Sequence, residues 1–556
     1  MEHKFIEICL GENYGWHQQP VAEGIVYFKG YLNGFFDKKS ASVFLAKVLD
    51  KSAKKNLHSL DKLDGHYAAI YIKSKYAIVI VDRVRSIPLI WSVAPDGRYI
   101  VGDHAKPVIQ KLNLKLKNIN ADAAKDIAIA GYSLGRDTLY QNVNSMLPGD
   151  MIILPDFRKK PQKLRYSYYR PWLTEKEGDS EDDIREELRN LTLKILQKLI
   201  VRANGRQILL PLSAGLDSRL IASGLKHLGY DNVCCFSYGK KGNHEAVAAK
   251  SIAKKLGYPW YFLPTITKKM REFRKGEDFE RYITLADSLS STPVEQDVFT
   301  IMQLKKQSWA NHNAIIVNGQ SGDFISGMHI PTLLKDNVPL QRNKREQTIM
   351  NAMANKHFGL WLDLKDSKNL LRIKKRIWKE LDEVKAPLNE PSKAYSLYEF
   401  LEFQNRQSKY VLGNQRSYEV FGWDWHLPLW DNEYVEFWQK VPLHLKYKQR
   451  LYRDMLVTEN WGGVWGELLP APHWIMPKWI RPFRHIARIF CAPFGKTIWH
   501  SVERRIFNHI MDNNRNYDAV SYIEVLTGPP HRNSISWLTK LYLKKYGLDR
   551  RGSALD

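Results

Sequence analysis

The stretch Leu212-Ser213-Ala214-Gly215-Leu216-Asp217-Ser218-Arg219 decides the fold of the middle of this chain. It follows a short apolar run at 207–212 and opens a helical pattern. A loop between a strand and a helix presents free amide groups at the positive end of the helix, so it can hold pyrophosphate. Ser213 and Ser218 add hydroxyl donors, and the small residues let the backbone approach the anion. Because Asp217 would repel phosphate unless a cation lay between them, we interpret it as a magnesium ligand.

The sequence on either side of this loop alternates between strand and helix patterns. Such alternation predicts a parallel sheet with helices on both faces. The expected strands are 207–212, 232–237 and 314–317, and the expected helices are 184–202, 219–228, 244–256 and 299–307.

The first 165 residues have a different hydrophobic pattern: short apolar segments typical of strands recur about every ten residues, with turn signals between them. The predicted fold class is therefore α/β: an antiparallel N-terminal sandwich followed by a parallel-sheet domain. The charged stretch 174–183 reads as a linker, and the chain from about 469 onward is rich in Trp, Arg and Pro. The predicted strands are 24–28, 67–72, 77–81 and 88–91, and the predicted domains are 1–170, 178–468 and 469–556.

The composition of the 556 residues limits the class of protein. At 44% hydrophobic and 26% charged residues the chain is ordinary globular material. It has no uncharged apolar run of about 18 residues and no apolar core of a secretory signal near its start. Four cysteines exclude a disulfide-stapled fold and a four-thiolate zinc site, and they predict a cytoplasmic location. The formal charge of +25 admits nucleic acid, anionic lipid or polyanionic glycan as a partner, or simply a solvated basic surface.

The loop at 212–219 resembles the Ser-Gly-Gly-x-Asp-Ser pyrophosphate loop of ATP pyrophosphatases that adenylate a substrate, with Ala214 in place of the second glycine. The superfamily includes asparagine synthetases, β-lactam synthetases, lasso-peptide cyclases, GMP synthetases and tRNA-modifying enzymes. The resemblance implies ATP and Mg²⁺ as cofactors. It also implies an ATP-binding set, which we take as Leu212, Ser213, Ala214, Gly215, Asp217, Ser218, Ser237, Tyr238, Asn318 and Gly319.

Two further segments resemble asparagine synthetases in particular. Asn318-Gly-Gln-Ser-Gly-Asp323 is similar to their Ser-Gly-Glu-Gly-Ser-Asp-Glu loop, which implies that Asp323 binds magnesium together with Asp217. Gln320 takes the place of the catalytic Glu, so the role of that position is open, and Phe324 replaces the second acidic residue. The segment 422–431 is similar to the Gly-x-Glu-x-Arg-x-Pro-Phe-Leu-Asp segment of the family, with Asp for Glu and His for Arg.

The resemblance also implies a lysine that stabilises charge on the adenylate. The family register gives Gln449 before Arg453, and Lys448 lies one residue away. Lys448 is our candidate catalytic lysine. The alternative is a surface lysine in a basic run with Lys446 and Arg450.

The first region resembles the class II glutamine amidotransferase domain that precedes asparagine synthetase, on the segments 63–68, 81–89 and 147–149. That domain needs Cys directly after the initiator Met, so that its α-amine acts as base for the thiolate. Here residue 2 is Glu, and Cys9 lies inside an apparent strand. Phe28-Lys-Gly-Tyr31 stands where the glutamine-binding Asn-Gly-Glu is expected, so we predict that glutamine hydrolysis is lost.

The C-terminal residues 471–556 carry 14 Lys and Arg against 6 Asp and Glu. Within them, 479–490 mixes cations with aromatic and aliphatic residues. On a helix this pattern predicts contact with an anionic membrane or an acidic lipid-linked glycan. The alternative is a packed helical extension with an exposed basic face.

Together these features predict an asparagine-synthetase-like ligase, in which a carboxylate attacks ATP and an amine or ammonia then displaces AMP. Aspartate is the default acceptor by resemblance, and a uronic acid of a glycan or a peptide carboxylate is the alternative. The nitrogen comes from free ammonia, from a partner glutaminase or from the substrate. A tRNA-modifying enzyme and a non-catalytic nucleotide-binding protein are the rival classes, and no specific nucleic-acid partner is expected.

Overall fold

The structure is a computed structural model of the chain. Three predictions fall wholly or partly outside the residues that it describes: the position of residue 2, the linker at 174–183 and the domain boundary near 469. The described residues are 5–53, 57–156, 159–167, 169–173, 179–336, 338–466 and 475–555.

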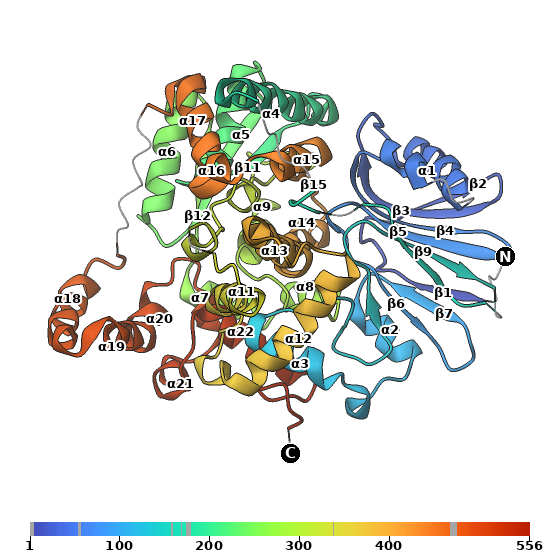
Figure 1. Cartoon of the computed structure of the whole chain (residues 1–556). Helices are drawn as coiled ribbons and strands as arrows, with labels where there is room; N and C mark the ends of the chain where they lie inside the picture. The colour runs from blue at the N-terminus through green and yellow to red at the C-terminus, as the bar shows by residue number, and fades with distance from the viewer. Residues whose placement is uncertain are drawn as a thin grey trace.

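The N-terminal region contains two sheets packed against each other, on the right of Figure 1. A six-stranded antiparallel sheet has the order β10-β9-β5-β4-β3-β2, and a four-stranded sheet has the order β1-β7-β6-β8, in which β1 and β7 run parallel. The strands are β1 (Ile6–Cys9), β2 (His17–Val21), β3 (Gly24–Leu32), β4 (Gly65–Ile72), β5 (Tyr76–Val81), β6 (Ile90–Val93), β7 (Tyr99–Gly102), β8 (Asn144–Ser145), β9 (Asp150–Pro155) and β10 (Gln162–Arg165).

Strand β4 shows why this region forms a sandwich, because all of its residues are buried. Successive side chains of a strand point to opposite faces. Tyr67 and Ala69 join an apolar cluster with helix α1 (Lys38–Ala53), whereas Ala68 and Ile70 join the core with the four-stranded sheet. The six-stranded sheet is therefore covered on both faces.

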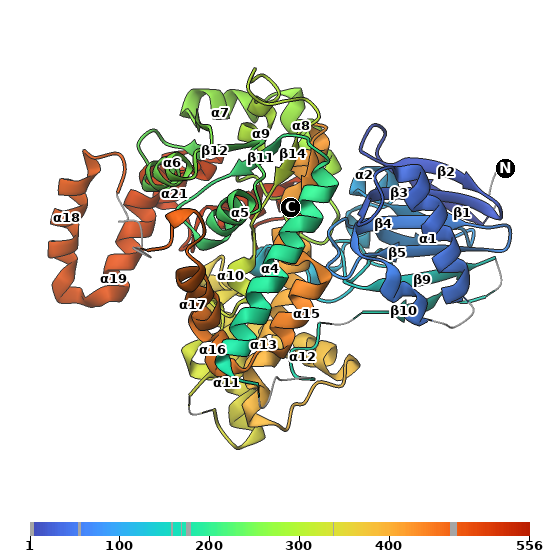
Figure 2. The same cartoon turned by 90° about the horizontal axis from the view of Figure 1, so that it is seen from above.

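The second region is built on a parallel sheet with the strand order β13-β12-β11-β14-β15. Chain order reverses between β11 and its neighbour β14, and ligands of such sheets bind at the carboxyl ends of the strands beside this reversal. Figure 2 shows α7 and α9 on one side of these strands and α5 on the other. The strands are β11 (Ile208–Pro211), β12 (Val233–Gly239), β13 (Trp260–Pro264), β14 (Ile315–Val317) and β15 (Asp424–His426).

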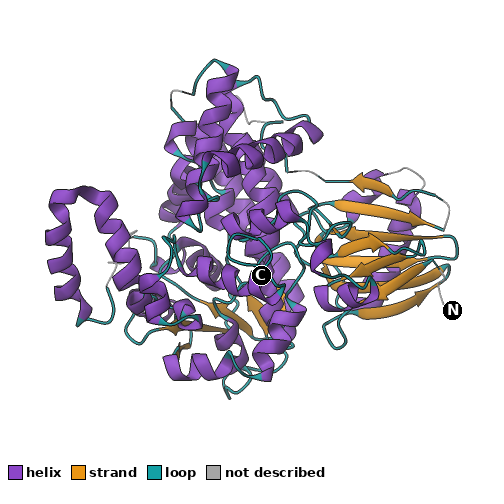
Figure 3. Ribbon diagram, turned by 90° about the horizontal axis from the view of Figure 1, so that it is seen from below, coloured by secondary structure: helices purple, strands orange, loops and turns teal. Residues whose placement is uncertain are grey.

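Helices make up most of the molecule outside the front sandwich, whose strands gather at one side (Figure 3). Near the C-terminus, α22 packs back on α3 of the N-terminal region. These helices are α2 (Ala105–Lys111), α3 (Ala121–Ala130), α4 (Glu181–Ala203), α5 (Leu216–His227), α6 (His244–Leu256), α7 (Thr267–Phe273), α8 (Glu277–Leu285), α9 (Val298–Leu304), α10 (Gly322–Ile325), α11 (Arg342–Lys356), α12 (Ser367–Glu383), α13 (Ala394–Leu401), α14 (Gln415–Val420), α15 (Asn432–Lys440), α16 (Leu443–Lys446), α17 (Arg450–Glu459), α21 (Tyr522–Thr527) and α22 (Ser534–Lys545).

Two further helices stand apart from the body of the molecule. Helices α18 (Ile480–Cys491) and α19 (Gly495–Val502) project from the side opposite the front sandwich, and α20 (Asn508–Met511) leads back to the body, where Lys240 donates to Ile510 O. Within the described residues, none of the helices has both the length and the apolar character needed to cross a membrane.

The predicted fold class is confirmed, with a largely antiparallel N-terminal sandwich and a parallel five-stranded sheet. The helix predicted over 244–256 has those bounds. The helix predicted to begin at 219 begins at Leu216, because Gly215 is its N-cap and the loop is shorter than the pattern suggested.

Candidate active site

The loop at 212–215 lies at the carboxyl end of β11, directly before α5. Its amide groups already hold oxygen atoms: Gly215 N–H donates to Ser213 Oγ over 3.1 Å, and Ala214 N–H donates to Glu245 Oε2 over 2.7 Å. Glu245 lies in the first turn of α6. The loop amides therefore donate to oxygen atoms, one of them a carboxylate oxygen, as the amides of a phosphate-binding loop must.

The loop after β14 closes on the first loop. A Cβ added at Gly319 would lie 3.0 Å from the backbone of Asp217 and Ser218, and one at Gly322 would lie 2.6 Å from Cγ of Asp217. Only glycine fits these positions without displacement. The absence of side chains at Gly319 and Gly322 therefore allows the second loop to approach the first closely enough to place Asp323 beside Asp217.

Asp217 and Asp323 meet at the junction of these loops. Asp323 N–H donates to Asp217 Oδ2 over 3.0 Å, and Tyr452 on α17 donates to Asp217 Oδ1 over 3.1 Å. Burial, together with the neighbouring charge of Asp323, raises the pKa of Asp217 to about 8. The side chain of Asp323 remains half exposed. A divalent cation between the two carboxylates would relieve their repulsion, so this pair fits a magnesium ion that is also held by phosphate.

A hydrogen-bonded network of His329, Glu402 and His357, which the sequence did not predict, contacts the side chain of Asp323. His329 Nε2 lies 3.1 Å from Asp323 Oδ2, and its Nδ1 lies 2.6 Å from Glu402 Oε1. Burial opposes the charged imidazole, but Glu402 and the hydrogen bond to Asp323 raise the pKa of His329 to about 9. His357 lies on the other oxygen of Glu402, at 3.2 Å. The network therefore presents a positive charge to Asp323 and fixes its orientation.

The two loops open into a cavity of about 870 Å³. Among its described lining residues, Arg406 is the only Lys or Arg, and it comes from the π-helix η6 (Glu402–Tyr410). Arg406 also contacts Glu402, at 3.3 Å. Of the predicted site residues, the cavity is lined by Leu212, Ser213, Gly215, Asp217, Ser218, Ser237, Tyr238, Asn318, Gly319, Gln320 and Asp323.

The remaining predicted residues take different places. Ala214 contributes its amide to the loop but does not line the cavity. Gln320 donates from Nε2 to Gln415 Oε1 over 3.1 Å, so a neutral amide pair stands at the position where the sequence resemblance implied Glu. The Ser237 hydroxyl donates to Leu212 O over 2.7 Å and thereby ties the end of β12 to the loop.

Lys448 is not part of this cavity. Lys448 and Gln449 both have positive φ, +54° and +62°. Gln449 is buried and lines the cavity, whereas Lys448 is exposed and lines a second cavity. The left-handed turn at these two residues therefore sends neighbouring side chains to different cavities, a feature that no spacing rule reveals.

The second cavity has a volume of about 650 Å³ and is lined by positively charged side chains. His329 and Lys448 line this cavity, whereas their neighbours Asp323 and Gln449 line the first one. Burial lowers the pKa of Lys356 in its wall to about 8. Within the described part of the chain, no Asp or Glu lines this cavity, but Lys356, Lys448, Arg453 and Arg532 do.

The segment 422–431 does not line the first cavity but lies between its second loop and the front sandwich: Asn318 N–H donates to His426 O over 3.2 Å. Asp424 pairs with Arg202 at 2.6 Å and with Arg206 at 3.0 Å. His426 stacks on Tyr31 of β3, with ring centroids 4.9 Å apart. This segment therefore helps to join the two regions.

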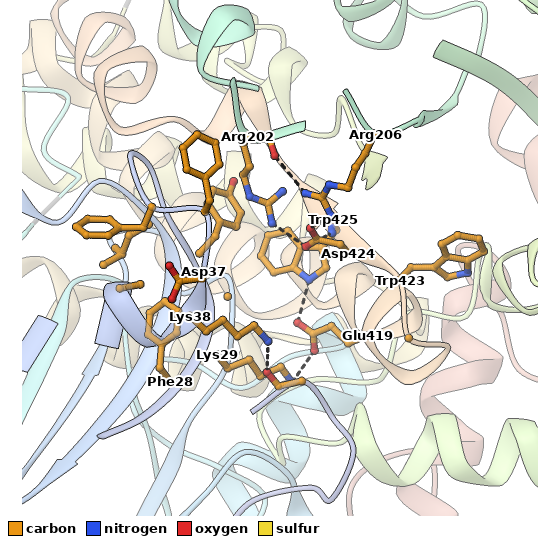
Figure 4. Close-up of a pocket in the computed structure, with 18 of the residues that line it drawn as sticks. Phe28, Lys29, Asp37, Lys38, Arg202, Arg206, Glu419, Trp423, Asp424 and Trp425 are labelled. Carbon is orange, nitrogen blue, oxygen red and sulfur yellow. Dashed lines mark hydrogen bonds and ion pairs between the residues drawn. The ribbon is translucent and has the colours of Figure 1, made fainter. Parts of the chain in front are cut away.

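An interface pocket of about 500 Å³ lies beside this junction (Figure 4). Lys29 of β3 is 2% exposed and pairs with Glu419 at 2.7 Å. Its ammonium group lies 3.2 Å from the centre of the Tyr14 ring. The position where the amidotransferase family has Asn-Gly-Glu is thus occupied by an internal ion pair.

Cys9, the only cysteine near the N-terminus, lies in the interior of the front sandwich. It is buried on β1, and burial raises the pKa of its thiol to about 11. A Cβ at Gly102 of β7 would lie 3.0 Å from Cys9 O, which shows how closely the neighbouring strand covers it.

The site is thus a cavity at the carboxyl ends of a parallel sheet, where two carboxylates lie beside the amides of a loop that opens a helix. The family model of asparagine synthase matches residues 204–458. The chain is therefore similar to asparagine synthase over that range, which includes both loops of the cavity and Tyr452.

Comparison with solved structures gives weak likenesses. One is the structure of the allosteric regulatory enzyme of purine biosynthesis, which is 12% identical to this chain. The match covers 44% of this chain and 61% of that chain, with a TM-score of 0.19. The other is glutamine phosphoribosylpyrophosphate amidotransferase from B. subtilis complexed with ADP and GMP: 12% identical, with 54% and 63% covered and a TM-score of 0.18. The chain thus spans less than two thirds of either structure. No curated protein matches the chain.

Proposed function

We propose that the chain activates a carboxylate as an acyl-adenylate, releasing pyrophosphate, and then transfers the acyl group to ammonia or an amine. The observation that carries this proposal is the meeting of Asp217 and Asp323 beside the loop amides, at the edge of the sheet where nucleotides bind. Asp217 and Asp323 would hold Mg²⁺, which would neutralise pyrophosphate charge. Ser213, Gly215 and Ser218 would bind the phosphate oxygens. Arg406 would stabilise the negative charge that develops during transfer.

The acceptor is aspartate by default. The second cavity supports a more acidic acceptor, because four cations and no described carboxylate line it. It is linked to the first cavity by two contacts: His329 in its lining hydrogen-bonds Asp323, and Lys448 in its lining precedes Gln449, which lines the first cavity. A substrate carboxylate in the first cavity would then leave a further anionic group for Lys448 and Arg453. Such a group suits a uronic acid in a glycan better than a neutral peptide carboxylate.

The nitrogen in this proposal does not come from glutamine hydrolysed by the chain itself. Cys9 is buried with a raised pKa, and the Lys29–Glu419 pair fills the position expected for glutamine binding. Free ammonium, a partner glutaminase or an amine on the substrate would supply it. The proposed location is the cytoplasm, where ATP is available.

Exchange of labelled pyrophosphate into ATP tests the reaction. We expect exchange that depends on Mg²⁺ and on an acidic carboxylate, with aspartate and glucuronate as first probes. Asp217→Ala should abolish exchange, and Asp231→Ala, which removes an exposed carboxylate from a surface ion pair with Lys226, should not. Dependence on tRNA would support the tRNA-modifying class, and nucleotide binding without any exchange would support a non-catalytic protein.

Amide formation tests the nitrogen source. Ammonium should support the reaction, and glutamine should not replace it. Measurable glutaminase activity of the purified chain would contradict the proposed loss. The acceptor proposal has its own readout: Arg453→Gln should raise KM for an acidic acceptor while leaving the affinity for ATP unchanged.

A further inference from the structure

The hairpin formed by α18 and α19 exposes an unusual amount of apolar surface. It projects from the body of the molecule in two perpendicular views (Figures 1 and 2). Phe490 is 73% exposed and Phe494 is 72% exposed. The large apolar side chains exposed on α18 and the turn after it are Trp479, Phe483, Ile486, Ile489, Phe490 and Phe494.

Helix α18 has three distinct faces. Successive residues of an α-helix turn by about 100°. This spacing puts Phe483, Ile486 and Phe490 on one side, and it puts the cations of the helix on the opposite side. Ile480, which is buried, lies between these two faces and joins Trp499 of α19 in a small core. The exposed apolar face is therefore not the face that holds the hairpin together.

The polar side of the hairpin carries one sign of charge. Between residues 475 and 502 there is no Asp or Glu, and each ionisable side chain apart from Cys491 is Lys, Arg or His. Glu503 follows this range, and Arg484 Nε donates to it over 2.8 Å. Arg481 and Arg488 have no carboxylate partner among the described residues. The hairpin thus offers an aromatic apolar face together with unpaired positive charge.

We propose that α18 and α19 form an interfacial anchor that lies on an anionic membrane surface. An amphipathic helix with Trp and Phe on one face and Lys or Arg on the other inserts its apolar face at the boundary between headgroups and acyl chains. Nearby cations add attraction to anionic lipids. A second copy of the chain is a poor occupant, because association would bring two sets of positive charges together.

Membrane binding is independent of the chemistry proposed above and has a separate readout. The full-length protein would be sedimented with vesicles of phosphatidylcholine, with and without phosphatidylglycerol, at low and high salt. We expect binding only to the anionic vesicles, weakened by salt. The variant Phe483→Ser/Phe490→Ser/Phe494→Ser should bind about 100-fold more weakly or worse. Arg481→Glu/Arg488→Glu should lose roughly tenfold or more.

Matched controls separate the hairpin from general surface effects. Phe36→Ser/Leu340→Ser/Leu371→Ser removes three exposed apolar side chains elsewhere, and Lys117→Glu/Lys379→Glu reverses two distant charges. Both controls should bind like the parent protein. The hairpin variants should retain nucleotide binding, which shows that the body is folded. Failure of the parent protein to bind anionic vesicles would overturn the proposal. Equal binding by the triple hairpin variant, or a dimer that this variant dissociates, would also overturn it.

Discussion

Replacing Gly322 by Ala tests whether the two loops must touch for the site to work. The added Cβ would lie 2.6 Å from both Cγ and Oδ1 of Asp217, and 2.6 Å from Cδ1 of Leu429. Ordinary contacts begin near 3.4 Å. Asp217 or the second loop must therefore move by roughly 1 Å, and a misplacement of this size costs about 100-fold in activity. The strain should also lower the free energy of unfolding by about 1–3 kcal/mol.

The assay is calorimetric titration of Mg²⁺-ATP, followed by pyrophosphate exchange. Gly359→Ala is the matched control, because its added Cβ would meet only Ala354 O, at an ordinary 3.7 Å. We expect exchange by Gly322→Ala to fall about 100-fold and the control to stay within about twofold of the parent. Exchange at the parent level by a folded Gly322→Ala protein would refute the claim that Asp217 is positioned by the second loop.

Three further predictions address other parts of the molecule. Burial lowers the pKa of Lys29 from 10.5 to about 8, so the unfolded chain binds more protons between these pH values and stability should rise with pH there. Lys29→Met should remove up to about 3 kcal/mol of this rise in urea unfolding, and an unchanged pH profile would contradict the assigned burial. Cys9→Ser should leave ammonium-dependent activity unchanged, and a glutaminase activity lost with Cys9 would show that this thiol is a nucleophile. Arg406→Gln should lower exchange by about 100-fold with exposed Arg281→Gln as control, whereas an equal effect of both would exclude a role for Arg406 at the phosphates.

The sequence predicted those parts of the site that lie close together along the chain. The loop at 212–219 has a strand before it and a helix after it, and small residues with one Asp give it a recognisable chemistry. Asp323 was predicted from the resemblance of its loop to that of asparagine synthetases, and this loop follows a second strand of the same sheet. Parallel strands bring their carboxyl ends to one edge, so two such loops must be neighbours.

The rest of the site depends on packing between distant segments. Tyr452 reaches Asp217 across 235 residues of chain, and Glu402 reaches His329 across 73. No local pattern marks these residues, because a single Tyr, Glu or His on a helix is usually part of an ordinary interior. The positive φ values at Lys448 and Gln449 likewise arise from the turn between α16 and α17. The mixture of cations and apolar residues at 479–490 predicted a helix, but only the structure shows that it projects.

The central claim is that Asp217 and Asp323 hold a divalent cation on the triphosphate of ATP. Anomalous diffraction from crystals soaked with Mn²⁺ and a non-hydrolysable ATP analogue tests it most directly. The account predicts a manganese peak between these two carboxylates, with the phosphates on the amides of Ser213–Gly215. A nucleotide bound with its metal elsewhere, or bound away from this loop, would contradict it.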